Sequence, residues 1–446
     1  MRKAKDRTIQ TLLAASLLLF AGAKVSTQGT QDVQNLPGPA VPSLRSIEDL
    51  NYVGGDAAYP TFSDAAIDPN SAFRRSLYRH GMALRIIPQI QYSQNMLAPP
   101  VPADSQVYIG ERPFESAMIQ PIFTADLRQL HMRQSQFYMS GVWDWMTWNP
   151  AGPKSLQMCG IYFYKAFGEN RVAIKAGYVY NNLEFLGFFV GGSTASGAQG
   201  VYAILPYEAG MSYFPMTAAT FNVQVQGPKY TYFKTAAQRS LDPGGGPTEV
   251  ARNHTGFRFD PHGDKLLSIN EGGFQFPAKA DVHEAWLRAG YMYNFTAYNN
   301  AATGRSNSGN ECVYALMDYQ LRQSNRDHPN HGLYLGGSAE AATPTLNAYA
   351  RYYEARLYQE APFRRRPDDL ASLVASRTGY SKYFTDNLVA EGKSVWRAST
   401  TITGFYSLHV SPGNYLVLGL SYDYGPAITP RTGNALKFLT TWTVFF

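Results

Sequence analysis

The sequence of 446 residues is poor in charge, in cysteine and in long apolar segments. Charged residues make up 16% of the chain, whereas a typical soluble domain has roughly 25%. The two cysteines are too few for a disulfide framework or a cysteine-rich zinc site. Beyond residue 23, no segment offers the roughly 20 consecutive apolar residues that a transmembrane helix needs. This composition argues against a polytopic helical membrane protein.

Aromatic residues are abundant instead. They make up 14% of the chain, with 31 tyrosines, 25 phenylalanines and 6 tryptophans. Disordered chains are rich in charge and poor in aromatics, so this composition excludes extensive disorder. Low charge, many tyrosines and no strong hydropathy peak together indicate a β-rich chain that contacts lipid.

The N-terminus predicts export. Residues 1–7 carry four basic groups and one acidic group, residues 11–23 are apolar, and Ala21-Gly22-Ala23 is a small-x-small cleavage signal. We predict a secretory signal peptide at residues 1–23, because the apolar run is too short to span a bilayer; a short anchoring helix is the alternative. Much of the formal net charge of +6 lies in this leader, so the charge predicts no nucleic-acid partner. The exported protein would be periplasmic, secreted or an outer-membrane barrel.

Period-two alternation begins after an irregular leader. Residues 24–80 are rich in Pro, Gly, Ser and Asp, and we interpret them as a periplasmic leader with one short helix at Ser71–His80. From residue 81 onward, apolar residues alternate with polar or small ones, which predicts strands with one apolar face. The clearest alternating segments are residues 172–180, 221–226, 396–410, 415–424 and 436–446.

Alternation also fits a soluble β-sandwich, but three features favour a transmembrane antiparallel β-barrel over residues 81–446. The alternating segments run to about ten residues, as a tilted membrane strand requires. Aromatic residues gather near their ends, as in an aromatic girdle. The last strand ends on Phe446, which we expect to engage the barrel-assembly machinery. At roughly 20–25 residues per strand with its connection, the segment predicts about 16 strands around an aqueous lumen.

Several motifs resemble one family, the carbohydrate-selective outer-membrane porins that are similar to OprB. Their order and spacing across most of residues 81–446 support the resemblance, whereas residues before 80 and Ser240–Pro247 depart from the pattern. The motifs are Ala125-Asp126-Leu127, residues 183–192, Pro206–Tyr213, Gly332–Ser338, Arg366–Leu370, Thr400–Gly404, and Pro426–Arg431 followed by Ala435-Leu436. The resemblance implies a barrel of about 16 strands through which glucose and other small sugars diffuse, with arginines and acidic residues at a constriction.

The alternation also predicts which side chains line the lumen, since they lie opposite the apolar face. A neutral sugar suits a wall of amides, carboxylates and guanidinium groups, because its hydroxyls donate and accept hydrogen bonds. The predicted pore-lining residues are Arg85, Asp126, Arg171, Lys175, Gln224, Arg288, Asp318, Arg322, Glu354 and Arg356, with Gln89, Gln91, Asn222, Gln226 and Arg397 on the same faces. Each of these could also simply solvate a wide pore. Their excess of cations leaves a general or anion-selective porin as an alternative.

Other groupings of reactive side chains are better explained by loops or pore lining. His254, Asp260, His262 and Asp264, like Asp327, His328 and His331, occur in loop composition, and we expect no metal or other cofactor. Ser407 and His409 share a lumen-facing strand, which leaves an outer-membrane hydrolase as the least favoured function; we expect no enzyme.

Three tryptophans and two cysteines complete the expectations. Trp143 and Trp145 are expected in a lipid-facing girdle, and Trp148 could face the mouth of the barrel. Cys159 and Cys312 could pair or remain free thiols.

The sequence thus predicts an outer-membrane porin whose partners are small carbohydrates and outer-membrane lipid, with no nucleic acid and with a homo-oligomer left open. Loops or the leader are expected to narrow the mouth.

Overall fold

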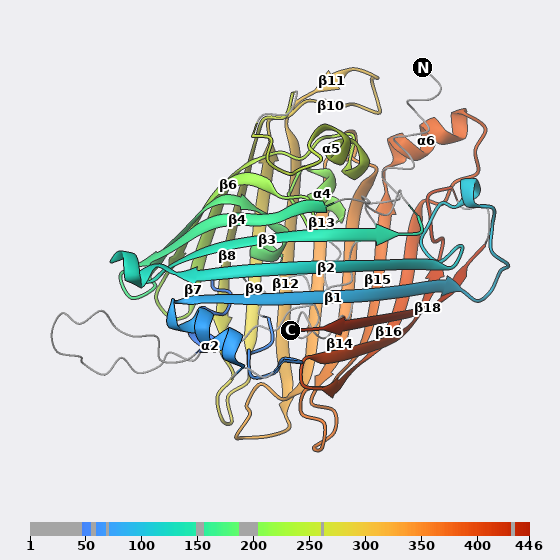
Figure 1. The fold of residues 1–446 in the computed structure, drawn as a ribbon. Coiled ribbons are helices and arrows are strands. Elements are labelled where there is room, and N and C mark those ends of the chain that lie inside the picture. The colour runs from blue at the N-terminus through green and yellow to red at the C-terminus, as the bar shows by residue number, and fades with distance from the viewer. Residues whose placement is uncertain are drawn as a thin grey trace.

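The computed structural model describes residues 47–54, 59–67, 71–148, 156–186, 204–259, 263–429 and 433–446. The predicted signal peptide at residues 1–23 and the leader up to residue 46 lie outside the described residues. The rest forms a closed barrel of sixteen strands (Figure 1), which confirms the fold and the strand number expected from the sequence. A barrel of this size encloses an aqueous lumen rather than a packed core.

Every wall strand pairs antiparallel with its neighbours in chain order, and β1 pairs with β18 to close the barrel. β10 (Tyr298–Asn299) and β11 (Ser306–Asn307) form a separate hairpin between β9 and β12. The wall strands are β1 (Met82–Asn95), β2 (Phe114–Asp126), β3 (Ser135–Met146), β4 (Leu156–Phe167), β5 (Val172–Val179), β6 (Ala218–Gln226), β7 (Thr231–Arg239), β8 (Leu266–Phe276), β9 (Ala285–Asn294), β12 (Asn310–Gln323), β13 (Gly332–Ala342), β14 (Tyr349–Glu360), β15 (Leu370–Tyr380), β16 (Ala398–Ser411), β17 (Asn414–Tyr424) and β18 (Ala435–Val444).

The apolar and polar side chains of the strands point in the directions expected of a membrane barrel. Ile119 on β2 faces outward and is 45% exposed, whereas the adjacent Gln120 faces inward and is 3% exposed. The same contrast holds for Ile90 and Gln89 on β1. Apolar side chains therefore face outward and many polar ones face inward, which is the reverse of a β-sandwich. The outer membrane is the environment that this surface fits.

The two ends of the barrel differ in their connections. Residues 168–171 and 412–413 make short turns at one end, called here the turn end. At the other end, the loop end, long connections join β1 to β2, β5 to β6 and β7 to β8. Short turns face the periplasm and long loops face the cell exterior in barrels of this class. The C-terminus also lies at the turn end, where the Phe446 N–H donates to the Ile86 carbonyl (2.9 Å).

The helices are short and lie in the connections. None in the described part of the chain is long and apolar enough to cross a membrane. They are α2 (Ala72–Arg79), α3 (Asn182–Phe185), α4 (Ile204–Glu208), α5 (Gly246–Arg252) and α6 (Lys382–Ala390), with 3-10 turns η2 (Ile47–Leu50), η3 (Ala103–Ser105) and η4 (Leu127–Leu130). Ser71 caps α2 by accepting from the Arg74 N–H, so this helix falls in the stretch where the sequence predicted one.

Candidate functional site

The inner wall carries a charged cluster on β12, β13 and β14. The Arg356 guanidinium donates to both carboxylate oxygens of Asp318 (Nε–Oδ1 3.0 Å, Nη2–Oδ2 2.9 Å) and to Ser338 Oγ (2.9 Å). It also donates to Glu354. Arg356 and Glu354 have side chains almost fully buried, whereas Asp318 remains 18% exposed. The planar guanidinium therefore satisfies two carboxylates at once and neutralises much of their charge.

A glycine makes this arrangement sterically possible. Asp318 and Arg356 lie on strands that are both paired with β13, and each stands opposite Gly336. A Cβ on Gly336 would lie 2.3 Å from Arg356 Nε and 2.7 Å from Asp318 Oδ1. The absence of a side chain at this position lets the guanidinium cross β13 and reach the carboxylate.

A second charged pair continues the same cross-strand row. Lys437 on β18 contacts Asp423 on β17 (Nζ–Oδ2 2.7 Å), and Ser421 donates to the same carboxylate (3.0 Å). The Lys437 side chain is 17% exposed, as open as that of Asp318. The row thus presents partly exposed acidic and basic groups to the lumen, each beside a partner of opposite charge.

Two other charges on this wall have buried atoms without hydrogen-bond partners. Arg288 on β9 donates from Nη2 to the Leu186 carbonyl (2.7 Å) and lies 3.5 Å from the Trp286 ring centroid. Within the described chain, its Nε and Nη1 have no partner, and neither do the two carboxylate oxygens of Glu340 on β13. Arg288 and Glu340 are thus incompletely satisfied charged groups on the inner face of the barrel.

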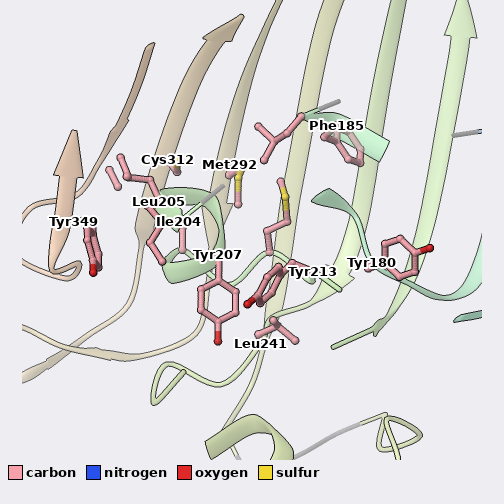
Figure 2. Packing of buried hydrophobic residues seen from close by; sticks show 14 of the residues in the cluster. Tyr180, Phe185, Ile204, Leu205, Tyr207, Tyr213, Leu241, Met292, Cys312 and Tyr349 are labelled. Carbon is pink, nitrogen blue, oxygen red and sulfur yellow. The ribbon is translucent and has the colours of Figure 1, made fainter. Parts of the chain in front are cut away.

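The connection between β5 and β6 enters the barrel. Its described parts, residues 180–186 and 204–217, supply Phe185, Leu205 and Tyr213 to a buried cluster that includes Met292 and Cys312 of the barrel wall (Figure 2). The burial of these apolar side chains favours the inward position of the loop, because it removes them from water. This inserted loop narrows the lumen from one side.

A second inserted segment comes from the N-terminus. Residues 47–54 and 59–67 lie against the inner wall near the turn end, where the Thr124 hydroxyl of β2 donates to the Leu50 carbonyl (2.6 Å) and Gln136 of β3 donates to the Asn51 carbonyl (2.9 Å). The Arg85 guanidinium lies 4.5 Å from the Phe62 ring centroid and is almost fully buried beneath this segment. We call these residues the N-terminal insert.

The two inserted segments meet at one ion pair. Lys175 of β5 contacts Glu184 of the loop (2.5 Å) and donates to the Gly54 carbonyl of the N-terminal insert (2.9 Å). The Tyr52 hydroxyl also donates to Glu184 (2.7 Å), and Lys234 of β7 donates to the Glu184 carbonyl (2.9 Å). Because Lys175 and Glu184 are both nearly buried, their separation would leave an unpaired charge. This junction links the insert, the loop and the wall.

The N-terminal insert is held at its other end by Asp64. The Gly413 N–H (2.7 Å) and His409 Nε2 (3.0 Å) contact its Oδ1, and the Tyr415 hydroxyl donates to Oδ2. Burial alone would raise the pKa of Asp64, but the hydrogen bonds from His409, Tyr415 and Gly413 outweigh it and hold the pKa below its usual value. His409 also lies 3.4 Å from Asp368. His409, the histidine considered for a hydrolase, thus contacts the N-terminal insert and the connection between β14 and β15.

Seven of the ten predicted pore residues lie on the inner face of the barrel, and three do not. Arg85, Lys175, Gln224, Arg288, Asp318, Glu354 and Arg356 lie on inward-facing strand positions. Of these, Asp318, Glu354 and Arg356 come together, whereas Arg85 and Lys175 hold the N-terminal insert.

The other three lie away from that wall. Asp126 ends β2 and pairs with Arg128 (2.8 Å), and Arg171 lies exposed in the turn between β4 and β5. Arg322 lies exposed on the outer face, because an irregularity between Gln320 and Arg322 shifts the register and reverses the alternation. Strict period two could not anticipate this shift.

Several lumen residues were missing from the sequence prediction. Lys234 on β7 and Glu271 on β8 face each other across the sheet, with Nζ and Oε1 3.8 Å apart. The Tyr232 and Tyr314 hydroxyls donate to the two oxygens of Glu271 (2.9 and 3.0 Å). Alternation in residues 231–239 and 266–276 is the signal that could have revealed them.

Other expectations have clear outcomes in the described residues. Trp143 and Trp145 face outward and are 47% and 39% exposed, as expected for a girdle, whereas Trp148 is buried and packs with Ile109, Phe114 and Met146. Cys159 and Cys312 are both buried and free. Asp260 and His262 lie outside the described residues, and the described residues contain no cluster of three potential metal ligands.

Comparison with known proteins agrees with this architecture. No curated protein matches the chain. The high-pH structure of Pseudomonas putida OprB superposes with a TM-score of 0.72 at 14% identity, covering 87% of this chain and 100% of that one. The low-pH structure of the same protein gives 0.53 at 13% identity, covering 86% and 99%. These likenesses show the fold. The family model of the carbohydrate-selective porins matches residues 89–438, and the chain therefore belongs to the OprB family of carbohydrate-selective porins.

Proposed function

We propose that this porin lets small neutral sugars such as glucose diffuse down their gradient across the outer membrane, along the wall formed by β12–β18 and β1. The observation that carries the proposal is the local pairing of charge on this wall. Arg356 lies between Asp318 and Glu354, and Lys437 lies beside Asp423. Paired charges supply many donors and acceptors with little net field, which suits hydroxyl groups more than ions.

The proposed contacts are weak enough for conduction. Asp318 and Lys437 are the partly exposed members of the row, and each is already bonded within the wall. A sugar hydroxyl would share these groups rather than replace their partners, so it would bind briefly and leave. Transport of this kind involves no cofactor and no covalent step.

Anion selectivity is the second candidate, and Arg288 favours it. The structure records no ion pair for Arg288 among the described residues, and two of its nitrogens are buried without hydrogen-bond partners. Such a cation would attract anions into the lumen. Arg288 lies on β9, outside the wall of β12–β18 and β1. The sugar proposal rests on the paired charges of that wall.

The test is single-channel conductance of the purified protein in planar bilayers. We expect millimolar glucose to lower the conductance of the wild type, and reversal potentials in a salt gradient to show weak ion selectivity. Arg356→Gln leaves Asp318 and Glu354 without their cation, so we expect cation selectivity and weaker glucose block. Arg322→Gln, on the outer face, is the matched control and should change neither. Strong anion selectivity without glucose block in the wild type would exclude the sugar proposal in favour of an anion porin.

A further inference from the structure

Two arginines face outward near the loop end of adjacent strands. Arg351 on β14 and Arg377 on β15 are both exposed, whereas the neighbouring Tyr352 and Thr378 face inward and are buried. Arg351 stands opposite Gly379, two residues from Arg377 along β15. Diagonal neighbours of this kind lie about 7–8 Å apart at their backbones, so both guanidinium groups can reach one anion.

The level of these arginines in the membrane follows from their aromatic neighbours. One outward-facing cross-strand row contains Tyr353, Arg377, Thr400 and Tyr424. Tyr353 and Tyr424 are 52% and 48% exposed, as expected for an aromatic girdle at the membrane interface. Arg377 therefore lies in the girdle at the loop end, and Arg351 lies nearer the loops. Both are at the depth of the lipid headgroups of the outer leaflet.

Neither charge is neutralised within the described chain. Among the described residues, the only hydrogen bond of either side chain is from Arg377 Nη1 to Thr400 Oγ1 (2.9 Å), a neutral acceptor. The acidic residues of the adjacent α6 connection are already paired, Asp386 with Arg397 (2.6 Å) and Glu391 with Lys393 (3.1 Å). Glu311, an exposed outward residue, lies on β12, beyond the intervening β13. A guanidinium keeps its charge in any protein environment, and the described residues offer these two no carboxylate to pair with.

We propose that Arg351 and Arg377 bind a phosphate group of the glycolipid, lipid A, in the outer leaflet around the barrel. Arginine matches phosphate geometry with paired hydrogen bonds, and a phosphate at headgroup depth is where these side chains lie. Lys382 on the adjacent loop-end connection adds one further positive charge, since the other two basic residues there are paired with acids. The site lies on the outer wall and is independent of sugar passage through the lumen.

The test measures binding of purified diphosphoryl lipid A to the full-length protein in detergent micelles by native mass spectrometry. We expect the double variant Arg351→Gln with Arg377→Gln to bind about thirtyfold more weakly, since each cation near a lipid surface contributes about 1 kcal/mol. Arg322→Gln removes an outward arginine at the turn end and should bind lipid A like the wild type. The double Arg→Lys variant keeps the charge and should retain most of the affinity.

Measurements with other lipids show which part of lipid A the protein recognises. Dephosphorylated lipid A should bind the wild type as weakly as lipid A binds the double Gln variant. Equal binding of lipid A by the wild type and the double Gln variant would overturn the proposal, and so would equal affinity for phosphatidylglycerol, which lacks the glycolipid headgroup. Unchanged single-channel conductance in the double Gln variant shows that the barrel is folded, so loss of binding cannot arise from misfolding.

Discussion

At the scale of single residues, glycines in the wall determine how charged and aromatic side chains lie against the lumen. Gly336 lets Arg356 reach Asp318 across β13, and Gly290 does the same for Tyr314, whose ring would meet a Cβ there at 2.1 Å. The Tyr314 hydroxyl then reaches Glu271 on β8. Each glycine keeps a long side chain flat on the wall, so that it is held in place without filling the channel.

Substitution of Gly336 by alanine tests this steric role. Gly336→Ala places a methyl group within 2.3 Å of Arg356 Nε, and we expect it to lower the stability of the barrel by about 1–3 kcal/mol through overpacking. Thermal unfolding in detergent measures the effect. Gly337→Ala is the matched control, because its Cβ would make only ordinary contacts at 3.5 Å or more. Equal loss in both variants would refute the steric explanation.

Glu208 in α4 predicts a pH dependence of the inserted loop. Burial raises its pKa to about 8, although the N–H groups of Tyr349 and Ala348 oppose the shift. The folded loop therefore binds this proton more tightly than the unfolded one. The contribution of Glu208 to the stability of the inserted loop is fully present below its unfolded pKa of about 4.5. This contribution declines as the pH rises and is lost above a pH of about 8.

The variant Glu208→Gln should remove this decline, since an amide oxygen can still accept from the Tyr349 N–H (2.9 Å). We expect limited proteolysis of the β5–β6 connection to speed up between pH 5 and pH 8.5 in the wild type and to change less in the variant. Identical pH profiles of the two proteins would show that Glu208 is not the group responsible.

At the scale of elements, alternation predicted the strands and most of their faces, whereas it could not predict which inward residues meet. The outward positions of Trp143 and Trp145 and the inward positions of Arg288 and Arg356 follow from period two. Arg322 was misplaced, because a single register shift changes the face of every following residue. The burial of Arg85 under the N-terminal insert was also unpredictable, because the insert has no periodicity.

The junction of the inserted elements yields a prediction about gating. Lys175→Met removes the cation that contacts Glu184 and the Gly54 carbonyl. Because Glu184 is then buried without its ion pair, we expect the local stability of the junction to fall by about 3–5 kcal/mol. We expect rapid current fluctuations in planar bilayers as the insert and the loop loosen. Lys165→Met is the control, since Lys165 lies on the outward face of neighbouring β4. Steady current in the Lys175 variant would mean that the two segments are held by other contacts.

At the scale of the whole molecule, the lumen is narrowed from two directions. The loop between β5 and β6 packs on the wall within the barrel, and the N-terminal insert occupies the turn end between Gln136 of β3 and Gly413. The sequence predicted that loops or the leader would narrow the mouth, but not where either would bind. Their positions depend on contacts between residues more than a hundred positions apart, such as Tyr52 with Glu184, which local patterns do not encode.

Removal of the N-terminal insert should widen the channel. Deletion of residues 24–67, with the predicted signal peptide at residues 1–23 retained for export, removes the groups of the insert that contact Arg85 and Lys175. We expect higher single-channel conductance and weaker block by glucose, with the barrel still resistant to detergent. Unchanged conductance would place the narrowest point at the inserted loop alone.

The closure of the barrel also bears on the order of its assembly. β1 and β18 pair through contacts such as Gln89 with Thr443, nearly the whole chain apart, and contacts of such long range form slowly. The Ala66 N–H of the insert donates to the Phe445 carbonyl (2.8 Å), so the insert gains this anchor only when the final strand is in place. Closure between β1 and β18 thus also completes a contact of the insert, so the last strand of the barrel is tied directly to the segment that narrows its lumen.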